Sequence, residues 1–150
     1  MFFYNLVLLI HIFAAIFALG PGVIIKFLFA TAKSNSELKK ALEIRSQAVK
    51  LMMVCGGLLL ITGLALGFMN PLLFKVGWYH ASLTAFLIAI AIGPIFISKI
   101  MKKVKVLLDE QTGEEIPKEY YALTNKAKSF INLQNSLFII VLILMVLKPF

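Results

Sequence analysis

The sequence has little charge, a single cysteine and no acidic residue in its long apolar runs. Charged residues make up 15% of the chain, whereas soluble domains contain about 25%. The lone Cys55 excludes a disulfide within one chain. Without Asp or Glu in the apolar runs, neither a carboxylate relay for protons nor a Ser, His and carboxylate triad can be built there. These absences exclude a disulfide-stabilised domain and argue against a hydrolase or a proton transporter.

What the sequence contains instead is apolar residues, at 61% of 150 positions. A spanning helix needs about 20 mostly apolar residues, and LLLITGLALGF lacks the alternation of a barrel strand. The first run lacks a basic start and exceeds a secretion signal's apolar core of about 7–15 residues, so we interpret it as a retained helix. The four uncharged runs are 1–25, 51–74, 76–98 and 129–147. We predict an all-α fold, an antiparallel four-helix transmembrane bundle forming one domain over residues 1–150.

The distribution of basic residues predicts an orientation in the membrane. Thirteen of the 15 Lys and Arg residues lie at positions 26–50 and 99–128, and only Lys75 and Lys148 lie on the other side. The positive-inside rule therefore places both termini outside and both charged connections in the cytoplasm of a plasma membrane protein. Because these charges flank spans, the net charge of +8 indicates topology and not a nucleic-acid surface.

Two capping patterns indicate that helices extend into the cytoplasm. Ser34, followed three residues later by Glu37, is typical of a helix start, and no Gly or Pro interrupts the chain from there into the second span. Pro117 suits the first turn of a helix that continues into the fourth span. The segment DEQTGEEIP between the third and fourth spans predicts a turn.

Small residues indicate where helices approach closely. Gly56, Gly63 and Gly67 share one side of the second span. In the first span Ala15 and Ala18 follow His11 at helical intervals. That stripe admits either a neighbouring helix or a flat cofactor. We also expect bends at Pro21 and at Gly93-Pro94.

The chain has two histidines, His11 and His80, and both fall in the outer half of the predicted bundle. At 1.5 Å per residue His11 lies roughly 10 Å below the outer end of its span, whereas His80 lies near the interface marked by Trp78 and Tyr79. An ionisable side chain within a membrane indicates a functional site, although a neutral imidazole bonded to a neighbouring helix is the alternative. Met69 and Met145 lie at comparable levels.

Two metal centres suit these residues. Haem iron accepts imidazole or thioether ligands, and a four-helix bundle can hold the ring. Without a C-x-x-C-H motif the haem would be of b type. We therefore predict haem b bound by His11 and His80, with Ala15 and Ala18 beside it. Copper held by a layer of His11, His80, Met69 and Met145 is the alternative.

A polar patch in the fourth span has two interpretations. Ser129, Asn132 and Ser136 share one helical face, with Asn135 beside them. We expect these side chains to bond to other helices, with binding of a propionate or substrate as the alternative.

Three segments carry a resemblance to known families: LIHIFAAIFALGPG, GWYHASL and the ending VLKPF. The sequence resembles the HemJ type of small four-helix membrane protein, which oxidises protoporphyrinogen and binds haem b. It is also similar to CopD-type domains and to an uncharacterised family of the same layout. The resemblance implies that His11 is a haem ligand. Trp78, His80 and Leu83 match the third-span pattern Trp-x-His-x-Lys-Leu, but Ser82 replaces the Lys, so haem binding is implied more directly than porphyrinogen oxidation.

The resulting hypothesis is a multi-pass membrane protein that binds haem b and serves electron transfer or a haem-linked redox step. Its expected partners are the lipid bilayer, a membrane redox partner and further copies of the chain in a homo-oligomer. A copper-handling protein and a scaffold subunit without enzymatic activity, which packs through its glycines, are the alternatives.

Overall fold

The computed structural model describes residues 2–149, and within this range every regular element is a helix. A π-helical turn, η2, joins α3 and α4 into one long helix, and a 3-10 turn, η1, connects α2 to α3. The described range contains four helices long and apolar enough to cross a membrane. The predicted all-α fold is therefore confirmed. The elements are α1 (Phe2–Thr31), α2 (Asn35–Met69), η1 (Pro71–Lys75), α3 (Gly77–Ile92), η2 (Gly93–Ile97), α4 (Ser98–Glu110) and α5 (Lys118–Leu147).

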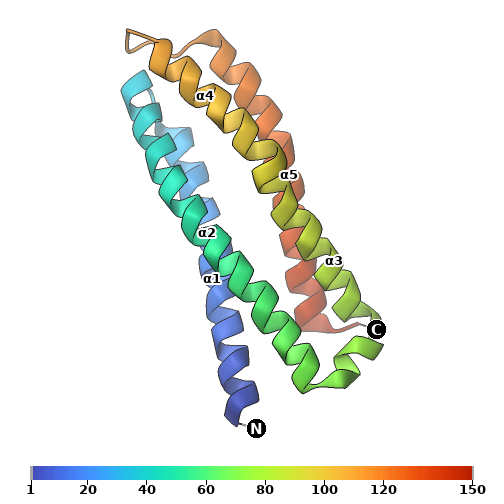
Figure 1. Ribbon diagram of the computed structural model, residues 1–150. Helices are drawn as coiled ribbons and strands as arrows, with labels where there is room; N and C mark the ends of the chain where they lie inside the picture. Colours follow the sequence, from blue (N-terminus) through green and yellow to red (C-terminus); the bar gives the residue numbers. More distant parts are fainter. Residues whose placement is uncertain (1, 150) are drawn as a thin grey trace.

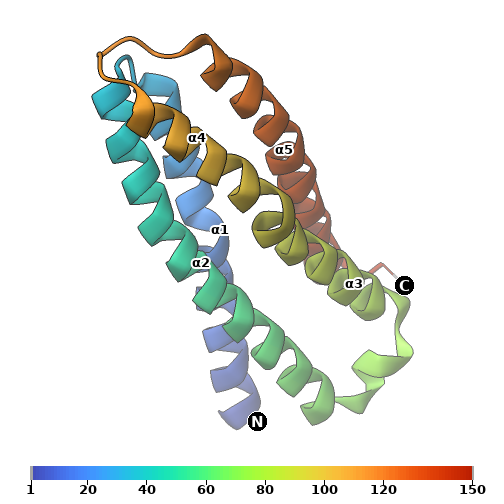
Figure 2. The ribbon, with the colours of Figure 1, turned by 45° about the horizontal axis from the view of Figure 1, so that its top comes forward.

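The long helices form two antiparallel pairs. α1 packs along α2, and α5 packs along the continuous helix made by α3, η2 and α4. The pairs meet where α2 contacts α4. Both chain ends lie at the same end of the bundle as the connection between α2 and α3, while the other two connections lie at the opposite end (Figures 1 and 2).

The helices are longer than a membrane requires. α2 has 35 residues, which corresponds to about 52 Å at 1.5 Å per residue, against a hydrocarbon core of about 30 Å. Its first turn is capped as expected, because the Ser34 side chain accepts a hydrogen bond from the Glu37 backbone N–H at 3.3 Å. The backbone N–H of Lys33 donates in turn to the Glu37 carboxylate at 2.6 Å. The prediction that helices continue beyond the apolar runs is confirmed.

Asn35 fastens the charged end of the bundle. Its backbone N–H donates to the Glu114 carbonyl at 3.0 Å. Its amide nitrogen lies 3.1 to 3.3 Å from the carbonyl oxygens of Leu108, Gln111 and Gly113. This side chain is buried, and it fixes the start of α2 against the connection between α4 and α5. Two segments separated by more than 70 residues are thereby held together.

The two predicted bends have different outcomes. Pro21 lies within α1, which continues from Phe2 to Thr31. At Gly93-Pro94 the helix changes to the π-helical turn η2. Proline has no backbone N–H to donate to the preceding turn, so the regular hydrogen-bond ladder is interrupted there. The helical axis thus adjusts at Gly93-Pro94 without breaking the span.

Two apolar clusters make up the core, and they differ in side-chain size. The cluster at the charged end contains large residues such as Leu38, Met101 and Leu108. The cluster at the other end includes Ala14 and Ala18 together with Leu59, Phe86 and Val141. Because alanine fills less volume, the second end of the bundle has room for a cavity.

Candidate functional site

A cavity of about 600 Å³ opens beside the alanine-containing cluster. Four helices, α1, α2, α3 and α5, contribute to its walls, which are almost entirely apolar. Pockets for small molecules are commonly about 300 to 1,000 Å³ with a few placed polar groups. Those polar groups here are His11, Tyr79 and Ser82.

The local sequence explains why space remains at this level. Ala15 and Gly20 of α1 and Gly63 of α2 line the cavity, and none of them carries a side chain larger than a methyl group. A Cβ added at Gly63 would lie 3.3 Å from Cε1 of His11. The imidazole therefore lies directly against the backbone of α2, which only glycine permits without displacement.

His11 is held in one defined orientation. The residue is buried, and its Nδ1 lies 2.7 Å from the Thr62 hydroxyl oxygen. That hydroxyl has one proton, which it donates to the Leu58 carbonyl at 2.7 Å. When the hydroxyl donates to this carbonyl it accepts from Nδ1 of His11, and Nε2 is then the ring nitrogen that keeps a lone pair. An imidazole of this form is ready to bind a metal.

Tyr79 joins α3 to α2 close to His11. Its hydroxyl donates to the Gly63 carbonyl at 3.1 Å, and a Cβ at Gly67 would lie 2.5 Å from the same hydroxyl oxygen. Gly63 and Gly67 are therefore covered inside the chain by His11 and Tyr79. They are not available for the external packing that a scaffold subunit would need.

The remaining predicted residues of α1 and α3 separate into lining and packing positions. Ala15 lines the cavity, whereas Ala18 is buried in the adjacent apolar cluster. Ser82 also lines the cavity, and its hydroxyl donates to the Trp78 carbonyl at 2.7 Å. Since that bond stays within α3, Ser82 gives the cavity a small neutral surface where a Lys would introduce a charge.

The structure does not bring His80 together with His11. His80 is exposed, and its Nε2 donates to the Phe74 carbonyl at 2.9 Å. Because a carbonyl only accepts hydrogen bonds, this Nε2 carries a proton and has no lone pair for a metal. Met69 is 44% exposed and also lies outside the cavity lining, whereas Met145 lines the cavity with His11. The four residues of the copper interpretation are thus divided between the cavity and the surface.

Two residues that shape the site were not predicted. Thr62 is the only hydroxyl-bearing residue in the second apolar run, which is a recognisable sign of a buried hydrogen bond. Its pairing with His11 spans 51 positions, and no pattern within one chain shows it. Tyr79 was interpreted as an interfacial residue, but it is buried and points inward because the glycines of α2 admit its ring.

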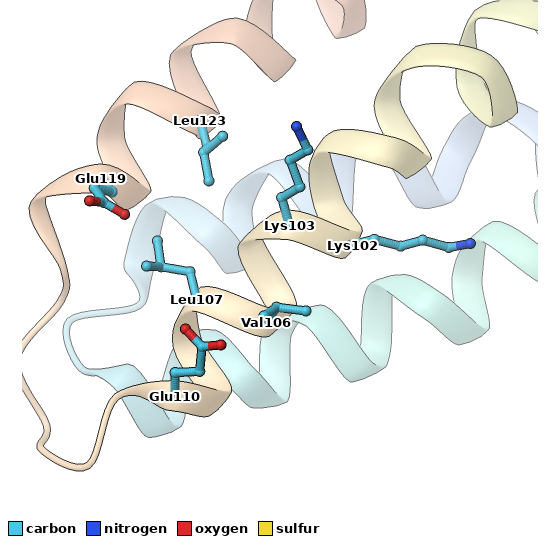
Figure 3. A pocket seen from close by; sticks show the side chains of 7 residues that line it. All are labelled: Lys102, Lys103, Val106, Leu107, Glu110, Glu119 and Leu123. Carbon is cyan, nitrogen blue, oxygen red and sulfur yellow. The ribbon is translucent and has the colours of Figure 1, made fainter.

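A second hollow of about 400 Å³ lies at the charged end between α4 and α5. Figure 3 shows Lys103 directed toward α5 and Lys102 directed away from it, with Glu110 and Glu119 at the rim. Nowhere in residues 2–149 do three His, Cys, Asp or Glu residues group as a metal site would need. We therefore take this hollow as part of the charged surface.

Comparison with known proteins agrees with a membrane protein. No curated protein and no solved structure matches the chain. One protein family does match, over residues 5–149, and its description names a membrane protein without naming a cofactor or activity. The resemblance to HemJ and CopD types therefore stays a prediction. By this match the chain belongs to the family described as "Predicted integral membrane protein (DUF2269)".

Proposed function

We propose that the chain binds haem b in the cavity of α1, α2, α3 and α5 and serves one-electron transfer within the membrane. The observation that carries this proposal is the position of His11, a buried imidazole at the cavity wall whose Nδ1 lies 2.7 Å from the Thr62 hydroxyl, which leaves Nε2 for a ligand. Metal-binding histidines almost always donate their other ring nitrogen to a neighbouring acceptor, which fixes the ring and its tautomer. Thr62 takes this role in the proposal.

The other residues of the cavity fit the same group. Apolar walls suit a flat macrocycle and exclude water, and Met145 provides a thioether from α5 as a second donor in place of His80. The carboxylates of haem need cations nearby. We assign this role to Lys148 at the same end of the bundle, where its Nζ lies 5.9 Å from the ring centre of Trp78; neither residue lines the cavity itself.

In this proposal haem supplies an iron atom that cycles between two oxidation states. His11 holds the iron, Thr62 prevents the imidazole from rotating, and the apolar side chains keep the site dry. The distribution of Lys and Arg supports an orientation with both termini outside a plasma membrane. The cavity then lies in the outer half of the bilayer, where it is accessible to redox partners at that surface.

The absorption spectrum of the detergent-purified protein, supplied with haem if necessary, tests the proposal. We expect a Soret band and sharp bands after reduction. His11→Ala should lose the haem because iron loses its fixed ligand. His80→Ala and Ser82→Ala should retain it, since neither side chain offers a free donor to the cavity. Equal retention by His11→Ala and the parent would contradict the site, and copper without haem in a metal analysis would contradict the cofactor.

A further inference from the structure

The outward face of α5 carries polar side chains that the bundle leaves without partners. The α5 amide that bonds to another helix is Gln134, whose Nε2 donates to the Ala89 carbonyl at 2.9 Å. Asn132 and Ser136 point away from that contact and are exposed, and within residues 2–149 neither makes a hydrogen bond to another helix. Gln134 was not part of the predicted patch, and within residues 2–149 none of its members, Ser129, Asn132, Asn135 and Ser136, makes the expected hydrogen bond to another helix.

These polar groups lie at the depth of the hydrocarbon. Gln134 is level with Ala89 and Gly93 of the antiparallel helix. The nearest charge along that helix is Lys99, six residues beyond Gly93, or about 9 Å at 1.5 Å per residue. Asn132 is two residues closer to the charged end than Gln134 and four residues, or about 6 Å, from Lys128 of its own helix, so it lies inside the apolar run 129–147 near its charged edge. Lipid offers an amide no hydrogen bond, so another protein helix is the expected partner.

Seven exposed residues of α5, named at the end of this paragraph, follow the spacing of a helix-packing seam. We call this set of residues the α5 seam. Their intervals alternate between four and three residues, the heptad spacing along which two helices wind with left-handed packing. The exposed fractions of Ile139, Ile143 and Val146 are 57%, 49% and 78%, and the other members are also exposed. The seam consists of Asn125, Ser129, Asn132, Ser136, Ile139, Ile143 and Val146.

We propose that the α5 seam packs against the same seam of a second copy of this chain, forming a symmetric dimer. Two copies with the same orientation in a bilayer are related by an axis along the membrane normal, so identical helices meet in parallel and in register. Asn132 then faces Asn132 of the second copy. An amide has both a donor and an acceptor and is therefore complementary to itself. A different protein would need its own polar group at this depth, whereas symmetry supplies one to the second copy.

Disulfide formation in native membranes tests which face of α5 meets a second copy. Cys55 is first replaced by Ala, and a cysteine is then placed at Asn132 or at Leu133. The Leu133 side chain is also exposed, lies at almost the same depth and points about 100° away around the helix. Since a disulfide needs Cβ atoms about 3.5–4.5 Å apart, we expect a cross-linked dimer from Asn132→Cys and none from Leu133→Cys.

Energy transfer between labelled copies in liposomes measures the contribution of the amide. Asn132→Leu should lower the association constant about threefold to twentyfold, the range of hydrogen bonds between membrane helices. Leu133→Ala should leave it unchanged. Because the seam faces outward, Asn132→Leu should keep the helical content of the parent by circular dichroism.

Three results would overturn the proposal. One is a parent protein that stays monomeric at all protein-to-lipid ratios. Another is equal cross-linking at positions 132 and 133. The third is a cross-linked product of Asn132→Cys whose mass shows a different protein.

Discussion

At the scale of single residues, the chemistry of the cavity depends on a hydrogen bond between two uncharged polar side chains. The Thr62 hydroxyl lies 2.7 Å from the Leu58 carbonyl of its own helix and 2.7 Å from Nδ1 of His11. The imidazole is thus buried and held in its orientation by a contact with an uncharged side chain. This arrangement gives Nδ1 of the ring a hydrogen-bond partner inside the apolar layer and leaves Nε2 for a ligand.

Thr62→Val should weaken haem retention without preventing folding. Valine has nearly the same shape but cannot form a hydrogen bond with Nδ1 of His11, so the ring loses its fixed orientation. Partners of this kind typically contribute about tenfold to a hundredfold in metal affinity. Haem titration of the purified variant measures the change. The matched control is Thr124→Val, because the Thr124 hydroxyl bonds only to carbonyls of its own helix near the charged end. An unchanged haem affinity in Thr62→Val would exclude Thr62 as the positioning residue.

At the scale of elements, the contact between α2 and α3 depends on glycines that receive aromatic rings. Gly67 lies under both Tyr79 and Phe74, with added Cβ distances of 2.5 and 2.8 Å. The rings of Phe74 and Tyr79 in turn meet edge to face at 5.3 Å. This contact closes the end of the bundle that holds both chain termini, beside the cavity.

Gly67→Ala should destabilise the protein, because the new methyl group occupies the position of the Tyr79 hydroxyl. Overpacking of this kind costs about 1–3 kcal/mol. Gly57→Ala is the control, since a Cβ there meets nothing within 4 Å and alanine favours a helix over glycine by about 0.5–1 kcal/mol. Thermal unfolding in detergent should show a lower midpoint for the first variant and an equal or higher one for the second. A Gly67→Ala midpoint at or above that of the parent would show that the rings can move aside.

At the scale of the whole molecule, the two helix pairs are joined at the charged end by hydrogen bonds between the start of α2 and the connection from α4 to α5. Glu114 contributes through its carboxylate, which accepts the Ser36 backbone N–H at 3.3 Å. That hydrogen bond, at the start of α2, holds the pKa of Glu114 below its ordinary value of 4.5. The ionised carboxylate therefore favours the folded connection.

The contribution of Glu114 should depend on pH in a defined direction. A lowered folded-state pKa stabilises the fold above pH 4.5, and the stabilisation is lost as the pH falls through the folded pKa. Glu114→Gln should thus have a lower unfolding midpoint than the parent at neutral pH and approach it in acid. The effect is small because the group is exposed. Glu115→Gln is the control at the neighbouring exposed position, and a difference for Glu114→Gln that persists in strong acid would contradict this account.

The sequence by itself determined the four spans, the helical class and the capped extensions, because these follow from local spacing and from the insolubility of charge in lipid. It also singled out His11, since an ionisable side chain in an apolar run is visible without any neighbour. Only the tertiary structure decided that Thr62 orients His11, that Tyr79 points inward and that His80 faces away. Those outcomes depend on how helices rotate against each other, and that rotation is set by glycine contacts between segments far apart in the chain.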